Sequence, residues 1–555
     1  MKNLFRYIIG GIAALLFFCN VPVYQARTPL FWMRTAEATV FPAWVPTIQS
    51  LQDLATINYS NTPYLNVLSY APGTGKGGGI LRLNPNDITS SSNGCTIFLD
   101  SGNNRFYREM SGPLNVFQCG AVGDSTTDDT AAEQAGINTI ANGGVVNTIQ
   151  GAPAGKLVWS GGTYKTTATL NIGALTFNNV GISMTGDGRG AAVIAGNVAG
   201  PVFQMASTTA SNQITDLLIT NNSNNAANRC ITVSGNSTTM QNLWMNCLSG
   251  IDFEGASDAH VSNIVCDGCL GPALVINNSH TIDIEGFEAF GTPSQFSQAV
   301  QCTGGSGGSY DIELNGLKTL ALGTSGVTVN SGCTLTMSAY GLNGAFGTYN
   351  DPTTHRGVVV NTGGVLNLGV GTITNWQAEG LFIAGGGTVY DTGASISANV
   401  QSATATNRYE VAGNDYQYFK SGGSIAGGSG LEIGLVNLLA NGDGILSLSG
   451  VALSNSADFG VVAQGTSSPI ASVSIIGCNF NAVNQLNSAG NTPIQITGSG
   501  ALAANISENI IVPSHAVTAA ITVSSGTANI TDNLSHSGTF PATAGSIVAT
   551  NNRNF

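Results

Sequence analysis

The sequence predicts an all-β protein, a single-stranded parallel β-helix built from short strands, on two observations. Glycine is abundant, at 73 of 555 residues, whereas Lys, Arg, Asp and Glu make up only 8% of the chain. The usual charged share is about 25%. Because long exposed helices need charged side chains, few helices are expected. The second observation is that strand-like segments of three to five residues recur about every 21 residues.

The repeat is clearest over residues 242–291. Segments 242–245, 263–266 and 283–286 align beneath one another, and each is followed by a glycine. A repeat of this length with three short strands and no helix is one coil of a β-helix, stacked about 4.8 Å from the next coil. We therefore expect stacked coils over residues 176–530. The crossover rule for parallel strands makes the solenoid right-handed.

Asparagine is expected at the turns of these coils. Its side chain tolerates a left-handed backbone and can bond the same residue type in the next coil. The candidates for such turn ladders are Asn221, Asn222, Asn224, Asn225, Asn277, Asn278 and Asn479.

Both ends of the solenoid have their own signals. Thr130 and Glu133 predict a capping box, Ile137 and Ile140 give an apolar stripe, and two glycines at 143–144 end the helix. This helix is expected to cap the open first coil, whose strand edges would otherwise be unpaired. The sequence divides into a leader at 1–38, a small N-terminal module at 39–115, the β-helix at 116–535 and a C-terminal tail at 536–555.

The segment around the predicted helix resembles the opening motif of the pectate-lyase superfamily, especially its rhamnogalacturonase and epimerase-like branch. The residues that carry the resemblance are Gly120-Ala121-Val122-Gly123-Asp124, Thr127-Asp128-Asp129-Thr130, Ala132, Gln134, Gly155-Lys156-Leu157-Val158-Trp159, Gly161-Gly162-Thr163-Tyr164 and Gly186-Asp187-Gly188. The resemblance implies a right-handed parallel β-helix and a polysaccharide partner. Residues 68–116 are similar to the module that precedes the β-helix in many phage tailspikes.

Three aspartates in this motif, Asp124, Asp128 and Asp129, have two interpretations. Paired carboxylates can hold a cation or share a proton. In the resembling family, however, the motif is structural. We expect these residues to cap the helix and satisfy its free N–H groups.

The first residues predict export. Two basic residues are followed by an apolar stretch at 7–18, and the small residues Ala36 and Ala38 favour cleavage before residue 39. The alternative is an uncleaved membrane anchor. With the leader removed, no stable membrane insertion is expected, and the protein is predicted to be secreted or on the cell surface.

Charge and cysteine content limit the partners. With 17 basic and 30 acidic residues the net charge is −13, which argues against nucleic acid as a partner. Of ten cysteines, Cys19 lies in the leader, so an odd number remains. Cys266 and Cys269 form a C-x-x-C, but no second pair stands at zinc-site spacing. We expect buried thiols with one or two disulfides, assign no metal ligand, and identify no cofactor.

The polygalacturonase-type mechanism is doubtful for this chain. Enzymes of that type place paired aspartates in the turn before a coil strand, where this sequence has Ser249-Gly250 and Gly271-Pro272. A calcium-dependent lyase needs several converging carboxylates. The candidates in coil register are Asp252, Glu254, Asp267, Glu285 and Glu288. The alternative for them is a set of solvated strand faces, since strand alternation points some of them apart.

A better candidate lies around the polar turn at 349–356. Arg356 and Glu379 precede Gly357 and Gly380 at the same place in successive repeats, so their side chains are predicted to pair. Asp351 and His355 would complete an acid, base and anion-binding set. The alternative is a structural salt bridge in a solvated loop.

Aromatic rings near this set are predicted to stack on sugar rings. The candidates are Tyr349, Trp376, Tyr416 and Tyr418. The alternative is that they pack against the solenoid. The sequence thus predicts an exported protein that acts on or binds polysaccharide, as a polysaccharide lyase or glycoside hydrolase. The other class is a non-catalytic surface adhesin or tailspike-like structural protein, and an oligomer is compatible with both.

Overall fold

The computed structural model describes residues 45–141, 155–173, 181–206, 211–223, 225, 227–290, 298–320, 323–344, 353–402, 405, 408–428, 432–440, 444–465, 472–485, 492–498, 503–524, 526–537, 540 and 547–554. Residues Pro46–Phe555 form one compact unit, to which the following description applies. The predicted leader at 1–38 lies outside the described residues.

The predicted parallel β-solenoid is confirmed. One of its sheets has fourteen strands, all paired in parallel with the strand of the next coil. These strands are β10 (Leu170–Ile172), β13 (Pro201–Met205), β16 (Arg229–Val233), β18 (Ser249–Glu254), β20 (Pro272–Asn277), β22 (Gln298–Thr303), β25 (Val327–Val329), β28 (Val358–Val360), β31 (Leu381–Ile383), β34 (Tyr409–Asn414), β37 (Gly434–Ala440), β40 (Phe459–Gly465), β43 (Ile494–Gly498) and β46 (Ile521–Val523).

The second sheet of the solenoid has 31 strands. They are β6 (Leu114–Asn115), β7 (Asp124–Asp128), β8 (Lys156–Trp159), β9 (Gly162–Thr166), β11 (Ser183–Gly186), β12 (Ala192–Gly196), β14 (Asn212–Thr215), β15 (Leu218–Asn221), β17 (Thr238–Asn246), β19 (Ser257–Asp267), β21 (His280–Phe290), β23 (Ser309–Asn315), β24 (Lys318–Leu320), β26 (Cys333–Ser338), β27 (Tyr340–Asn343), β29 (Val365–Leu368), β30 (Gly371–Thr374), β32 (Thr388–Asp391), β33 (Ala394–Ser397), β35 (Gln417–Ser421), β36 (Ser424–Ala426), β38 (Ile445–Ser449), β39 (Ala452–Ser454), β41 (Ser472–Ile476), β42 (Asn479–Val483), β44 (Ala503–Ser507), β45 (Ile510–Pro513), β47 (Thr527–Thr531), β48 (Leu534–Ser535), β49 (Ile547–Thr550) and β50 (Arg553–Asn554).

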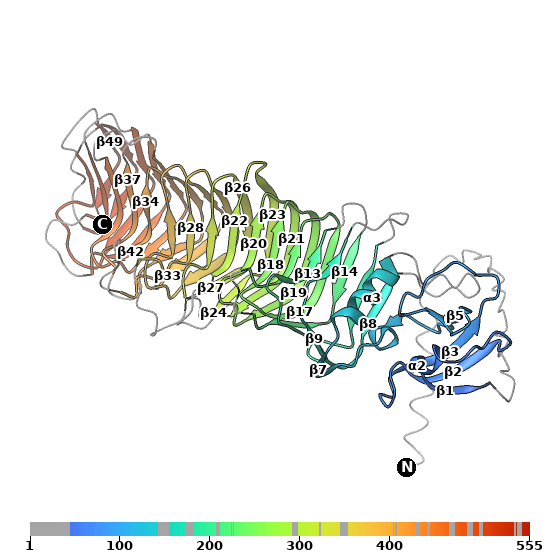
Figure 1. The fold of residues 1–555 in the computed structure, drawn as a ribbon. Coiled ribbons are helices and arrows are strands. Elements are labelled where there is room, and N and C mark those ends of the chain that lie inside the picture. The colour runs from blue at the N-terminus through green and yellow to red at the C-terminus, as the bar shows by residue number, and fades with distance from the viewer. Residues whose placement is uncertain are drawn as a thin grey trace, which may run out of the picture. The chain divides into compact units, whose positions relative to one another are not determined.

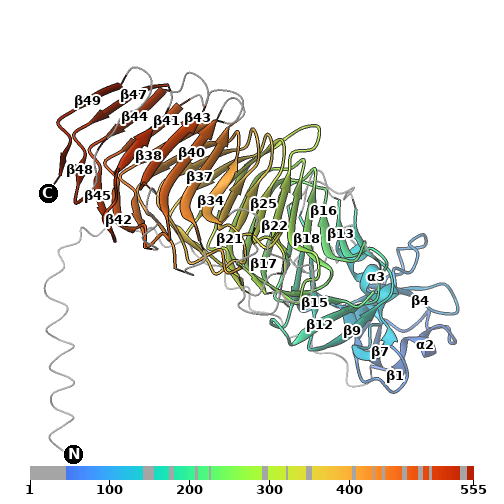
Figure 2. The ribbon, with the colours of Figure 1, turned by 90° about the vertical axis from the view of Figure 1, so that its left-hand side faces the viewer.

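Two parallel runs of strands make up this larger sheet. Each strand pairs with the strand two or three places further along the chain, as β29 pairs with β32 and β30 with β33. Most coils therefore have three strands, two in this sheet and one in the fourteen-stranded sheet, whereas β17, β19 and β21 each span both runs as one longer strand. Figure 1 and Figure 2 show the strands stacked in chain order. Strands β49 and β50 continue the stack through the stretch expected as a tail, pairing with β47 and β48.

Strand alternation separates the core from the surface. In the fourteen-stranded sheet, Ile231, Ile251 and Leu274 stand in register and are fully buried. One residue on, Thr232, Asp252 and Val275 stand in register on the outward face. Inward columns of this kind bury each coil against its neighbours. The side chains of the outward columns do not form the core, so functional residues are sought among them.

Asparagine ladders are present, but at positions other than the expected ones that the structure describes; the expected Asn224 lies outside the described residues. The side-chain amide of Asn509 donates to Asn533 Oδ1 at 2.9 Å, and Asn533 in turn donates to Asn552 at 2.9 Å. Asn242 and Asn263, both with positive φ, are bonded in the same way at 3.1 Å. Hydrogen bonding between asparagines of successive coils was therefore predictable from the sequence, whereas the turns at which it occurs were not.

One helix forms where it was predicted, although its capping differs. Helix α3 (Thr130–Ala141) contacts β8 and β10 and buries Ile137 and Ile140. The predicted capping box is wrong, because the helix begins at Thr130 and Glu133 is buried beneath it. Glu133 accepts hydrogen bonds from Trp159 Nε1 at 3.0 Å and Thr166 Oγ1 at 2.7 Å. Figure 1 shows α3 beside β8.

The three aspartates of the opening motif are structural, each in a different way. Asp128 accepts from the backbone N–H of Thr130, as expected for helix capping. Asp129 instead accepts from Val122 and Gly123, and Asp124 accepts from the N–H groups of residues 126 and 127. Backbone donors therefore occupy all three carboxylates.

A small sheet precedes the solenoid. It contains β1 (Thr47–Ser50), β2 (Tyr64–Ser69), β3 (Gly77–Leu83), β5 (Arg105–Arg108) and β4 (Ile97–Leu99) in that order, with a short helix α2 (Leu51–Leu54). Arg108 joins it to the turn η1 (Val116–Cys119): the guanidinium is buried and donates to the carbonyls of Cys95, Gly78 and Gln118. No helix among the described residues is long and apolar enough to cross a membrane.

Disulfides are more numerous than expected. The described residues contain four bonds: Cys95–Cys119, Cys230–Cys247, Cys266–Cys269 and Cys302–Cys333. The C-x-x-C pair is bonded to itself. Only Cys478 is free among the described cysteines, and it is buried.

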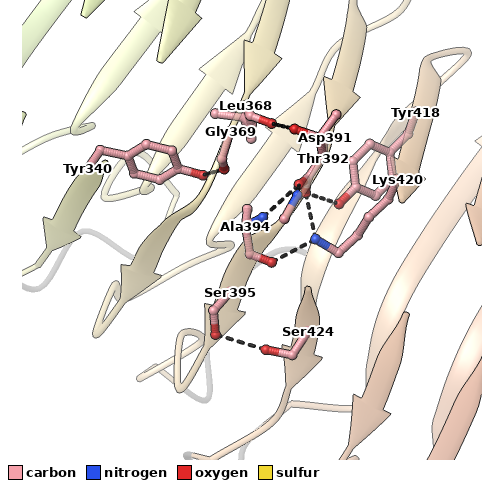
Figure 3. A network of polar contacts seen from close by, with 11 residues as sticks. Tyr340, Leu368, Gly369, Asp391, Thr392, Ala394, Ser395, Tyr418, Lys420 and Ser424 are labelled. Atoms are coloured by element: carbon pink, nitrogen blue, oxygen red, sulfur yellow. Dashed lines mark hydrogen bonds and ion pairs between the residues drawn. The ribbon is translucent and has the colours of Figure 1, made fainter. Parts of the chain in front are cut away.

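A charged pair lies inside the solenoid (Figure 3). Lys420 Nζ lies 2.8 Å from Asp391 Oδ2, and both side chains are fully buried. Tyr418 donates to the same oxygen at 3.0 Å, and Lys420 also donates to the Ala394 carbonyl at 2.7 Å. The other carboxylate oxygen accepts from two backbone N–H groups. Burial lowers the pKa of Lys420, and Asp391 opposes that shift.

We predict that Lys420→Met lowers the free energy of unfolding by about 3–5 kcal/mol, because it leaves the Asp391 carboxylate buried without its counter-charge. Denaturant unfolding of the full chain measures this. The matched control is Lys318→Met, which removes an exposed lysine paired with Glu288 and is expected to cost about 1 kcal/mol or less. Equal losses in the two variants would contradict the prediction.

Candidate functional site

The predicted pairing of Arg356 with Glu379 is present. Arg356 Nε lies 2.6 Å from Glu379 Oε2 across adjacent coils. The Glu379 side chain is fully buried, and the Arg356 side chain is 17% exposed. The guanidinium also lies 4.0 Å from the ring centre of Phe382. These contacts fit a shielded salt bridge, and a catalytic role for the pair stays a prediction.

The other members of the predicted set are only partly placed. His355 is fully buried, and its Nδ1 accepts from the backbone N–H of Gln377 at 3.0 Å. Its ring packs 4.8 Å from the ring of Trp376. Tyr349 and Asp351 lie outside the described residues. The structure therefore brings His355, Arg356, Trp376 and Glu379 together, and the one acid of this set that it describes, Glu379, is buried.

The predicted sugar-stacking rings are inside the solenoid. Trp376, Tyr416 and Tyr418 are all fully buried. Tyr416 donates to the Asn437 carbonyl at 2.9 Å, and Tyr418 donates to Asp391. Since none presents a ring face to solvent, the structure favours the alternative of packing against the solenoid, and it does not support their role in substrate binding.

A buried acid supports the turn that carries Trp376. The side chain of Asn399 accepts from the Trp376 N–H at 3.2 Å and donates to Glu410 at 2.7 Å. Burial raises the pKa of Glu410 to about 8, assisted by the charge of Glu432. Glu410 is therefore uncharged in the fold over a pH range in which it ionises in the unfolded chain.

We predict that Glu410 makes the protein less stable as pH rises from about 5 to 8. The contribution of protonated Glu410 to the free energy of unfolding is complete below the ordinary glutamate pKa of about 4.3. It is lost as pH rises through the raised pKa, and the free energy of unfolding falls by at most about 1.4 kcal/mol per pH unit. Unfolding free energies of Glu410→Gln should show a shallower slope than those of the unaltered protein. Glu313→Gln, at an exposed position, is the control and should keep the slope. A slope that Glu410→Gln leaves unchanged would refute this role.

A different group of residues places two acids on the outward face of a strand, one covered and one exposed. Asp252 and Glu254 lie on β18 two residues apart, so both point outward from the fourteen-stranded sheet. Two residues of extended strand span about 6.6 Å. Arg229, on the preceding strand β16, places Nε 3.1 Å from Asp252 Oδ2. Two carboxyl groups and one guanidinium thus share one face.

Their environments differ. Asp252 is nearly covered, and its Oδ1 has no hydrogen-bond partner within the described residues. Glu254 is exposed. Burial raises the pKa of Asp252, while the hydrogen bond and charge of Arg229 oppose the shift. Burial also raises the pKa of Glu254, and the charge of Asp252 adds to this. A covered acid with a raised pKa beside an exposed one is a candidate functional site.

The larger carboxylate cluster considered for calcium is divided between the two sheets. Asp252 and Glu254 are on β18, whereas Asp267 is on β19 and Glu285 and Glu288 are on β21. The five therefore do not converge on one cation. Sequence reasoning missed Arg229, although aligning residues 229–233 with 249–253 would have placed it one coil before Ser249.

Comparisons with known proteins give the following results. No family model and no curated protein matches this chain. Among solved structures, the A-module of mannuronan C-5 epimerase AlgE4 from Azotobacter vinelandii matches with a TM-score of 0.44 and 15% identity, over 69% of this chain and 96% of that one.

Two further solved structures are similar. WceF from Pantoea stewartii, a glycan biofilm modifying enzyme with a tailspike-like parallel β-helix fold, matches with a TM-score of 0.35 and 14% identity, over 56% of this chain and 49% of that one. The tailspike of Acinetobacter baumannii phage AM24 matches with a TM-score of 0.37 and 12% identity, over 63% of this chain and 64% of that one. Because the scores and identities are this low, these likenesses carry no argument, and we base the function on this chain's own residues.

Proposed function

We propose that this protein binds polysaccharide along the outward face of the fourteen-stranded sheet and hydrolyses a glycosidic bond at Asp252 and Glu254. The observation that carries the proposal is the pair of outward carboxyl groups on β18, with Arg229 bonded to one of them. Glycoside hydrolysis uses two carboxyl groups about 5–9.5 Å apart, and a backbone spacing of about 6.6 Å between Asp252 and Glu254 is compatible with such a separation.

Arg229 separates the roles of the two acids. Its charge favours the ionised form of Asp252, whose Oδ1 is buried and has no hydrogen-bond partner among the described residues, and the proposal assigns Asp252 the role of general base. Glu254, with a raised pKa and an exposed position, is the general acid. Glu254 protonates the bridging oxygen while Asp252 deprotonates a water that attacks the anomeric carbon. One glycosidic bond breaks, and the two products gain the elements of that water.

Three further features support an exported polysaccharide-active protein. Residues 120–188 resemble the opening motif of the pectate-lyase superfamily. Four disulfides among the described residues are typical of proteins in oxidising compartments. Together with the apolar leader, they favour a location outside the cytoplasm.

We predict that Asp252→Asn and Glu254→Gln each lower the rate of polysaccharide cleavage by on the order of 10²–10⁴-fold, since each removes one proton-transfer group. A panel of neutral and acidic polysaccharides is incubated with the full-length protein. Reducing ends report hydrolysis, and ultraviolet absorbance reports unsaturated lyase products.

The matched control for these variants is Glu285→Gln, on an outward position of β21 in the other sheet, which should keep full activity. Circular dichroism checks that each variant is folded. Unchanged activity in Asp252→Asn or Glu254→Gln would show that catalysis takes place at other residues. Unsaturated products would show that the protein cleaves by elimination and is not a hydrolase.

We predict that Arg229→Gln moves both limbs of the pH–rate profile to higher pH, by about one unit. Arg229 lowers the pKa of both Asp252 and Glu254, so its loss raises both values. The pH dependence of kcat/KM on the cleaved polymer measures the shift. Lys318→Gln removes one positive charge on the other sheet and should leave the profile in place. An unchanged pH–rate profile in Arg229→Gln would contradict the roles assigned to Asp252 and Glu254.

Binding without cleavage is the second candidate function. The same outward face carries uncharged polar side chains in other coils, namely Gln204, Thr232, Gln301, Thr328, Asn437, Gln495 and Thr522. Amides and hydroxyls of this kind bind sugar hydroxyls without chemistry. Binding of a polymer with no new reducing ends would favour this adhesin function.

A further inference from the structure

A hollow lies at three successive turns between the two sheets. It occupies about 430 Å³ and is formed where β15, β17 and β19 lead into β16, β18 and β20. Its lining includes Asn222, Asn246, Leu248, Gly268 and Leu270. The same three coils carry Arg229, Asp252 and Glu254, but none of those residues lines the hollow.

The walls of the hollow are fixed by buried contacts. Asn228, which is buried, donates to the carbonyls of Asn221 at 2.7 Å and Ser223 at 2.6 Å. Asn221 accepts from the Val198 N–H at 3.0 Å. The disulfide Cys230–Cys247 ties the first turn to the second, and Cys266–Cys269 closes the third. A ligand would therefore meet a site that is already organised, which lowers the entropic cost of binding.

The groups that face the ligand are amides and apolar surface. Asn222 and Asn246 are exposed, and within the described residues their side-chain amides have no hydrogen-bond partner. Leu270 is 40% exposed, and Leu248 is half-buried beside it. No charged side chain is among the described lining residues.

These observations point to the chemistry of the ligand. An amide offers two donors and an acceptor, which match sugar hydroxyls, and the leucines match the apolar C–H face of a sugar ring. A carboxylate or phosphate would find no cation in the described lining. We propose that the hollow is a binding site for an uncharged sugar unit. This site is separate from the acid pair and does not depend on cleavage.

Calorimetric titration of the full-length protein tests the site. The Asp252→Asn/Glu254→Gln background prevents turnover, and the probes are cellohexaose, mannohexaose and maltohexaose, with hexagalacturonate as the anionic comparison. We expect at least one neutral hexasaccharide to bind. Asn246→Ala/Leu270→Ala should weaken that binding by about tenfold or more, whereas any binding of hexagalacturonate should be unaffected.

The matched control is Asn315→Ala/Leu320→Ala, which makes the same changes at exposed positions on β23 and β24 and should leave binding unchanged. Failure of all neutral probes to bind, or equal binding with and without Asn246 and Leu270, would overturn the site. The cleavage assay on variants of Asp252 and Glu254, in which the hollow is unchanged, tests the acid pair alone. Failure of the proposed hydrolysis is therefore distinguishable from failure of the proposed sugar site.

Discussion

Stacking of each coil on the next is the constraint on which the structure depends. A coil of three short strands cannot bury its apolar side chains alone, so Ile231, Ile251 and Leu274 are covered only because their coils are in register. A slip of one residue would turn this column outward and point Thr232 and Asp252 into the core instead. Register therefore fixes both the core and the surface column that bears the candidate acids.

The ionisable side chains inside the solenoid follow the same constraint. The chain has few charged residues, yet Lys420, Asp391, Glu133 and Glu410 are buried. Each is held by hydrogen bonds from neighbouring coils or from the helix, as when Tyr418 and Lys420 meet Asp391. A buried charge without partners would cost several kcal/mol. These networks therefore penalise alternative registers that would leave an ion unpaired.

The sequence predicted the coils and one cross-coil pair, but not the surfaces. A repeat near 21 residues was enough for the solenoid, and equal positions in successive repeats were enough to pair Arg356 with Glu379. Tyr416 and Tyr418 were misread because local composition does not show which face of a strand is inward. Arg229 was missed because it reaches Asp252, three residues beyond its register partner Ser249. Contacts of that kind depend on side-chain length as well as on spacing.

Two independent features meet in the coils of β16, β18 and β20. The strand faces supply Asp252 and Glu254, whereas the turns before these strands supply the hollow lined by Asn246 and Leu270. Strands and turns are stabilised separately, the strands by the inward column and the turns by Cys230–Cys247 and Cys266–Cys269. Because a polymer is longer than either site, it can contact both at once, and linked contacts raise affinity without a new interaction. A stack of rigid coils is suited to such a substrate, since it fixes the distance between the two sites.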